Sequence, residues 1–154
     1  MKQQLIYTVG LPASGKTTWA IEYINSAPDR VIVSRDIIRE MLVEKYSDFP
    51  FGTKMEALVT DIELNAIDRA IHRGYSVVVD ATNFRMNHNI ARKYEESYRI
   101  EDGIDIEVSI KDFTSVPLAV CVQRDKERSE RGEKSVGEDV IISMYNRYLN
   151  PNRQ

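Results

Sequence analysis

Residues 10–17 of the 154-residue chain read Gly10-Leu11-Pro12-Ala13-Ser14-Gly15-Lys16-Thr17. The stretch fits the pattern Gly-x-x-x-x-Gly-Lys-Ser/Thr, and an apolar run, residues 5–9, comes directly before it. Glycines let backbone N–H groups turn inward around phosphate oxygens, and a following helix aims its N-terminus at the same anion. The lysine reaches the β- and γ-phosphates of a nucleotide, and the threonine hydroxyl suits Mg²⁺. We therefore expect residues 10–18 (through Thr18) to bind ATP, with Lys16 also catalytic and Thr17 a metal ligand.

Apolar runs and helical patterns alternate along the rest of the chain. Strands are predicted over residues 5–9, 31–33, 77–79 and 104–110. Helices are predicted over residues 17–25, 36–45, 53–73, 87–98, from 115 into the charged stretch 124–134, and 138–149, with a turn-rich stretch at 46–52. On the longest helix, the expected apolar face consists of Leu58, Ile62, Ala66, Ile67 and Ile71. This order indicates an α/β fold in three layers, with a mostly parallel sheet of about four strands and helices on both faces.

Composition limits the classes of protein that remain. The chain is 42% hydrophobic and 29% charged, and it contains one cysteine and two histidines. These values favour a single globular domain over residues 1–154 and argue against an internal disulfide or a zinc cluster. No apolar segment approaches the length of a membrane span, so we expect a cytoplasmic protein, monomeric as this domain. The net charge of −3 requires any nucleic acid to bind through a local basic groove.

Two further predicted strand ends carry polar residues, and ligands of open α/β sheets collect at such ends. Asp36 and Arg39 follow the second strand and, three residues apart, share a helix face. The carboxylate there can accept the proton of an acceptor hydroxyl while the guanidinium holds an anionic group. The alternative reading makes Asp36 a helix N-cap and Arg39 an exposed salt-bridge partner.

Asp80 ends the third predicted strand. In many nucleotide-binding proteins a carboxylate at such a strand end orients Mg²⁺, so we expect this role for Asp80; the alternative is a plain turn residue.

The stretch 124–134 contains five basic and four acidic residues. One interpretation is a solvated helix with weak ion pairs. The other is a lid, residues 124–137, whose arginine closes on the polyphosphate, with Gly132 ending the helix.

With these residues in view, the chain resembles the kinase domain of the bacteriophage-type polynucleotide 5′-kinases, within the P-loop phosphotransferase superfamily. The resemblance covers almost the whole chain and rests on residues 8–20, 34–36 with Arg39, 54–60, 82–83, 131–134 and 143–145. It implies a P-loop kinase fold with a helical lid, and transfer of the γ-phosphate of ATP to the 5′-hydroxyl end of RNA or DNA.

The resemblance also implies roles for individual residues. Lys16 and Thr17 hold the ATP phosphates and Mg²⁺, Asp36 is the general base, Arg39 binds the 3′-phosphate of the terminal nucleotide, and Arg131 is the lid arginine. It further implies acceptor-side positions for Arg35, Thr82 and Asn83.

The sequence departs from the family pattern at three points. The lid between Arg124 and Arg131 is about three residues longer, which makes Arg128 a rival to Arg131, and Asp80 is shifted by one position. The 3′-phosphatase module often fused to such kinases has no counterpart in residues 1–154, so no end-trimming activity is expected. Two other functions stay open: a P-loop kinase of a small metabolite or nucleotide, and a non-catalytic nucleotide-binding switch, against which a base at Asp36 argues.

Overall fold

The computed structural model describes residues 2–44, 47–49 and 52–153. The predicted segments at Lys45, Tyr46, Pro50 and Phe51 lie outside these residues. The elements run in the order β1 (Gln3–Val9), α1 (Lys16–Asn25), β2 (Arg30–Ser34), α2 (Arg35–Arg39), the π-helix η1 (Glu40–Glu44), α3 (Thr53–His72), β3 (Ser76–Asp80), α4 (His88–Glu101), β4 (Ile106–Asp112), α5 (Leu118–Glu130) and α6 (Glu138–Tyr148).

The four strands form one parallel sheet in the order β2-β3-β1-β4. Leu5 of β1 lies opposite Val77 of β3 on one side and Val108 of β4 on the other. All five residues of β3 are buried, as expected of an inner strand, whereas Ile106 and Val108 of the edge strand β4 alternate with the exposed Glu107. The α/β fold with a parallel four-stranded sheet, predicted from the sequence, is confirmed.

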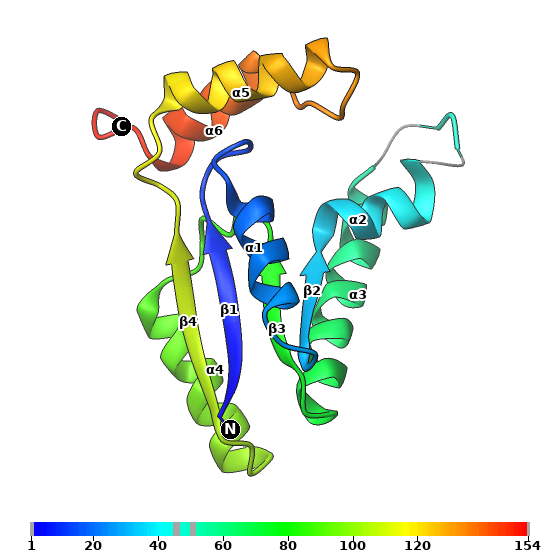
Figure 1. Ribbon diagram of the computed structural model, residues 1–154, viewed down its shortest axis with the longest axis vertical. Helices are drawn as coiled ribbons and strands as arrows, with labels where there is room; N and C mark the ends of the chain where they lie inside the picture. The colour runs from blue at the N-terminus through cyan, green and yellow to red at the C-terminus, as the bar shows by residue number, and fades with distance from the viewer. Residues whose placement is uncertain (1, 45–46, 50–51, 154) are drawn as a thin grey trace.

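Helices cover both faces of this sheet (Figure 1). On one face, α1 packs Ala20 against Ile6 and Val78. On the other face, α3 and α4 pack over a larger core that includes Ile67, Ala91 and further strand residues. The helices α5 and α6 lie beyond the carboxyl ends of the strands (Figure 1), around a cluster of Leu11, Cys121 and Ile141. Each layer therefore buries its own apolar surface. The helices α5 and α6 cover the carboxyl edge of the sheet.

Aromatic side chains of the last helix, α6, pack against neighbouring elements. Tyr148 of α6 stacks on Phe84, with ring centroids 4.7 Å apart, and Tyr145 packs against the cluster under α5. These contacts give the tyrosines a packing role.

The apolar face predicted for α3 is confirmed except at Leu58, since Ile67 and Ile71 are buried and Ile62 and Ala66 pack against the same core. Val59, Glu63, Ile67 and Ile71 are the buried residues of α3, whereas Leu58 is 43% exposed. The apolar pattern could not mark the buried Glu63, because it is a carboxylate that pairs with Arg35.

Two predicted boundaries are also corrected. The helix predicted over residues 36–45 is α2 followed by the π-helix η1, whose wider turn changes side-chain spacing too little to show in the sequence. Ile104, predicted to lie in the fourth strand, precedes β4. Its side chain packs on the core while its N–H donates to Tyr98 of α4 rather than to the sheet.

Candidate active site

Residues 10–15 form the loop between β1 and α1 at the carboxyl edge of the sheet, and Lys16 and Thr17 begin α1. A Cβ on Gly10 would lie 2.9 Å from the Phe113 Cβ and from the Ser14 Oγ, so only glycine fits there. Ala13 has a φ of 62°, a left-handed conformation that L residues adopt only when the surroundings hold them. The loop is therefore rigidly shaped by β1 and by the residues that follow β4.

Lys16, in the first turn of α1, folds its side chain back along this loop. Its Nζ donates to the Leu11 carbonyl at 2.6 Å and contacts the Ser14 Oγ at 3.4 Å, and the residue is only 8% exposed. Burial lowers the pKa of Lys16 to about 8, although Asp80 and Asp36 oppose the shift. The buried ammonium is thus held by the loop, at the position where phosphate charge would favour its protonated form.

Thr17 and Asp80 bring two oxygen groups together across the sheet edge. The Thr17 Oγ1 donates to the Asp80 Oδ2 at 2.7 Å, and Asp80 at the end of β3 is 8% exposed. Hydroxyl and carboxylate oxygens are the ligands that Mg²⁺ prefers, and it completes its shell with phosphates and waters. Among the described residues, no group of three or more His, Cys, Asp or Glu side chains is suited to a metal ion.

Asp36 and Arg39 lie on one face of α2, as their spacing predicted. The Arg39 Nη1 donates to the Asp36 Oδ1 at 2.8 Å, and the Asp36 side chain is 74% exposed. The N-cap of α2 is Ser34, whose hydroxyl accepts from the Ile37 N–H, so the alternative reading of Asp36 as the cap is wrong. Its carboxylate is available for another task.

Glu56 of α3 holds Arg39 from the opposite side. The Arg39 Nε donates to one carboxylate oxygen at 2.7 Å and its Nη2 to the other at 3.2 Å. The hydrogen bond to Arg39 contributes most to lowering the pKa of Glu56. These two hydrogen bonds to one carboxylate fix the plane of the Arg39 guanidinium.

Arg35 points toward α3, where its guanidinium is engaged by three side chains. It donates to Glu56 at 3.0 Å, to Thr60 at 3.1 Å and to Glu63 at 3.2 Å. Burial raises the pKa of Glu63, and the nearby Arg35 opposes that shift. These contacts give Arg35 a structural role between α2 and α3, beside the acceptor-side role that the family resemblance implies.

Thr82 and Asn83, the other acceptor-side expectations, differ in placement. Thr82 lines the cavity described below, and its carbonyl accepts from the Gly10 N–H at 3.1 Å. The Asn83 amide nitrogen donates to the Thr8 carbonyl at 2.8 Å and to the Val79 carbonyl at 3.1 Å. Asn83 therefore ties the ends of β1 and β3 together, which is a structural role.

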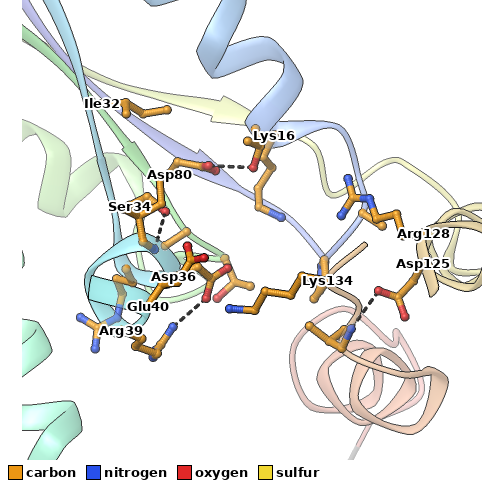
Figure 2. A pocket seen from close by; sticks show the side chains of 18 of the residues that line it. Lys16, Ile32, Ser34, Asp36, Arg39, Glu40, Asp80, Asp125, Arg128 and Lys134 are labelled. Atoms are coloured by element: carbon orange, nitrogen blue, oxygen red, sulfur yellow. Dashed lines mark hydrogen bonds and ion pairs between the residues drawn. The ribbon is translucent and has the colours of Figure 1, made fainter. Parts of the chain in front are cut away.

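One cavity of about 640 Å³ brings most of the predicted site residues together. Its walls come from the phosphate loop, α2, the end of β3, and α5 with the segment that follows it, and they include Lys16, Thr17, Asp36, Arg39 and Asp80. Figure 2 shows Lys16, Asp36, Arg39 and Asp80 around the common space. A smaller cavity of about 430 Å³ adjoins the other side of the phosphate loop and is lined by Trp19, Phe113 and Arg124 among others. The Arg124 Nη1 donates to the Ala13 carbonyl at 3.4 Å, which links α5 to the loop.

Arg128 and Arg131, the two candidates for a lid arginine, occupy different environments. Arg128, in the last turn of α5, lines both cavities. Arg131 lies just after α5 with 56% of its side chain exposed, and its Nε donates to Glu133 at 2.9 Å. Neither of the two cavities just described, both formed by described residues, is lined by Arg131.

Sequence reasoning missed several residues that the fold brings to this region. Glu56 and Glu63 were hidden within a helical pattern, although carboxylates on the buried side of a helix are a signal for partners such as Arg35. Asp125 and Lys134, in the charged stretch, also line the larger cavity. A charged run in a sequence does not indicate which of its members turn inward.

Fold and site together define a P-loop protein with a kinase-like fold. A sequence profile of the AAA domain family matches residues 5–151, so the chain belongs to that family. Among the described residues, no helix is both long and apolar enough to cross a bilayer.

Solved structures with similar folds include a chain of the Pnkp1/Rnl/Hen1 RNA repair complex, 26% identical with a TM-score of 0.72. That match covers 92% of this chain and 42% of the other, so the present chain spans about two fifths of its length. An inferred kinase from Chloroflexus aurantiacus (16% identity, TM-score 0.60, covering 86% and 69%) shares the fold. So does the tunicamycin resistance protein of Deinococcus radiodurans (13% identity, TM-score 0.54, covering 99% and 84%).

Proposed function

We propose that the chain is a polynucleotide 5′-hydroxyl kinase of the bacteriophage type, which transfers the γ-phosphate of ATP to the 5′-hydroxyl end of RNA or DNA. One observation carries the proposal. Lys16 and Thr17, which suit a nucleotide, and the pair Asp36 and Arg39, which suits an anionic acceptor with a hydroxyl group, line the same cavity. The likeness to a chain of an RNA repair complex at 26% identity supports a polynucleotide acceptor.

On the donor side, the backbone of residues 10–15 and the Lys16 ammonium bind the triphosphate. A bound anion stabilises the protonated lysine, whose pKa burial has lowered to about 8. Thr17 and Asp80 are the residues that would hold Mg²⁺, which would offset the negative charge of the phosphates. Arg128, between the two cavities, is placed to reach the same phosphates from the lid.

On the acceptor side, Asp36 takes the proton of the 5′-hydroxyl as the hydroxyl oxygen bonds to the γ-phosphorus. The bond between that phosphorus and the bridging β–γ oxygen breaks, and ADP leaves. Arg39, oriented by Glu56, binds a phosphate of the terminal nucleotide. Asp36 is exposed to the cavity and lacks a capping role, as a base that must meet a polymer end requires.

A kinase of a small metabolite is the second candidate, and one observation favours it. Four isoleucines line the wall of the cavity that faces α1 and α2: Ile21, Ile24, Ile32 and Ile37. An aliphatic wall beside Asp36 suits a compact organic acceptor as well as the face of a nucleobase.

The decisive experiment is a transfer assay with γ-labelled ATP. The protein is offered 5′-hydroxyl RNA and DNA oligonucleotides and, separately, a panel of nucleosides, nucleotides and small alcohols. We expect label on the oligonucleotide 5′ ends, lost in Asp36→Asn and retained in Asp139→Asn, a matched change at an exposed residue of α6. Label on a small acceptor alone would assign the protein to the second candidate.

A further inference from the structure

The segment between α5 and α6, residues 131–137, is fixed to α5 by a buried carboxylate. Asp125 is 4% exposed, and its two oxygens accept from the Val136 N–H at 3.0 Å and the Gly137 N–H at 2.9 Å. Figure 2 shows Asp125 on the lid side of the cavity, turned to this segment. Hydrogen bonds from backbone N–H groups to a buried carboxylate are among the stronger ones in proteins, so the end of the segment is held firmly.

The beginning of the same segment is fixed by the end of α5. Gly132 adopts a φ of 72°, its N–H donates to the Ser129 carbonyl, and the Glu133 N–H donates to the Arg128 carbonyl at 2.9 Å. With contacts at both ends, the intervening residues have little freedom. The structure therefore positions Lys134, which lies between the two fixed ends.

Lys134 reaches across the cavity from the lid toward α2. It lines the same cavity as Lys16 and Asp36, and Figure 2 shows its side chain pointing toward Asp36. A group beside the base is also beside the acceptor oxygen and the phosphorus that this oxygen attacks. In phosphoryl transfer the charge spreads over the oxygens of the group in flight, and cations placed there lower the barrier.

We propose that Lys134 is a catalytic residue that contacts the phosphoryl group during transfer from the acceptor side, and that Asp125 is the positioning residue that holds it there. The proposal rests on the proposed phosphotransfer. In this proposal the lid carries two cations with different roles. Arg128 binds the donor phosphates, and Lys134 contacts the phosphoryl group that passes from donor to acceptor. Lys134 takes no part in proton transfer in this proposal, and the hydroxyl proton still goes to Asp36.

The first test separates turnover from binding. Lys134→Ala is expected to lower kcat by about 10²-fold, the usual loss when one preorganised charge is removed, with KM for ATP changed less than about threefold. Lys134→Arg, which keeps the charge, should recover at least part of the loss. Lys126→Ala, at an exposed position of α5, is the matched control and should leave kcat unchanged. An unchanged kcat in Lys134→Ala would overturn the proposal.

A double-variant comparison tests the role of Asp125. Asp125→Asn replaces one accepting oxygen by an amide that cannot accept, and should lower kcat by about 10-fold or more with ADP affinity retained. If Asp125 acts through Lys134, combining both changes should be no worse than Lys134→Ala alone. Additive losses would show that Asp125 does not act through Lys134 and would overturn its assignment.

A second readout does not depend on the acceptor. ADP with Mg²⁺ and fluoroaluminate mimics the phosphoryl group in flight, and Trp19, the single tryptophan, lines the neighbouring cavity and reports binding by fluorescence. Lys134→Ala should weaken binding of the fluoroaluminate complex at least about 10-fold while ADP alone binds as in the wild type. If the wild type phosphorylates no acceptor, the proposed function fails while this measurement still decides the role of Lys134. Equal weakening for ADP alone would make Lys134 a plain binding residue and overturn its catalytic role.

Discussion

Arg39 is gripped by Glu56 through two hydrogen bonds, 2.7 Å and 3.2 Å long, while its remaining terminal nitrogen reaches Asp36 at 2.8 Å. The cation that is proposed to bind the acceptor and the carboxylate that is proposed to take its proton are thus set by one residue of α3. Glu56 also accepts from Arg35, so this one carboxylate links two arginines of α2 to α3.

The first prediction concerns this grip. Arg39→Ala should raise KM for a 5′-hydroxyl oligonucleotide about 10-fold or more and leave KM for ATP nearly unchanged, because the proposed function assigns Arg39 to the acceptor. Glu56→Gln should have a smaller effect in the same direction, since the guanidinium keeps its charge but loses a charged partner. Steady-state kinetics with each substrate varied in turn checks both. A rise in KM for ATP alone would place Arg39 on the donor side.

The second prediction is a pH effect on nucleotide binding. The pKa of Lys16 is lowered by burial to about 8, and a bound triphosphate raises it again because the anion stabilises the ammonium. Near and above pH 8, nucleotide binding should therefore take up a proton, and affinity should fall as the pH rises further. Calorimetric titrations at pH 8.5 in buffers of different ionisation enthalpy measure the proton uptake. Lys16→Arg, which remains charged, should show no such uptake.

The lowered pKa of Lys16 also affects folding stability, which should rise with pH where nucleotide affinity falls. Between pH 8 and the ordinary pKa of lysine, the unfolded chain binds the Lys16 proton and the folded protein releases it. For this group alone, the free energy of unfolding of the nucleotide-free protein then rises with pH across that window.

The third prediction concerns Asp36→Asn. Turnover should fall by about 10²-fold or more because the amide cannot take a proton. Thermal stability should stay within a few degrees of the wild type, since Ser34 rather than Asp36 caps α2. Rapid-quench measurement of transfer and a melting curve test the two parts together. Full activity in this variant would remove the base from the mechanism.

The fourth prediction orders the two lid arginines. The family resemblance favours Arg131, whereas the structure places Arg128 at both cavities and Arg131 in an exposed pair with Glu133. We therefore expect Arg128→Ala to depress kcat more than Arg131→Ala. Parallel kinetics of the two variants decide it, and the reverse order would mean that the lid moves Arg131 into the cavity during turnover.

The sequence was sufficient for the fold class and for the position of the phosphate loop, because both rest on local patterns. An apolar run before Gly10 and a helical pattern after Lys16 leave few alternatives. Local patterns could not predict the strand order β2-β3-β1-β4, because the order depends on pairing between strands that lie far apart in the sequence.

The side-chain network of the site was much less predictable. Asp36 and Arg39 share a helix face by spacing alone, which the 2.8 Å ion pair confirms. Glu56, Asp125 and Lys134 reach the site only because α3 and the lid fold over it from elsewhere in the sequence. Glu63 makes its position on α3 look solvent-exposed in the sequence, although the side chain is buried. The reason for its burial, the ion pair with Arg35, lies on α2 and is not visible in the pattern of α3.

The packing of Cys121 has a practical consequence. This single cysteine is fully buried between α5 and α6, and burial raises the pKa of its thiol, so little reactive thiolate is present at neutral pH. A cysteine introduced at exposed Ser135 would then be the one site that a maleimide dye labels quickly. A fluorophore attached there would report on the surroundings of residues 131–137 in solution, without first removing the native thiol.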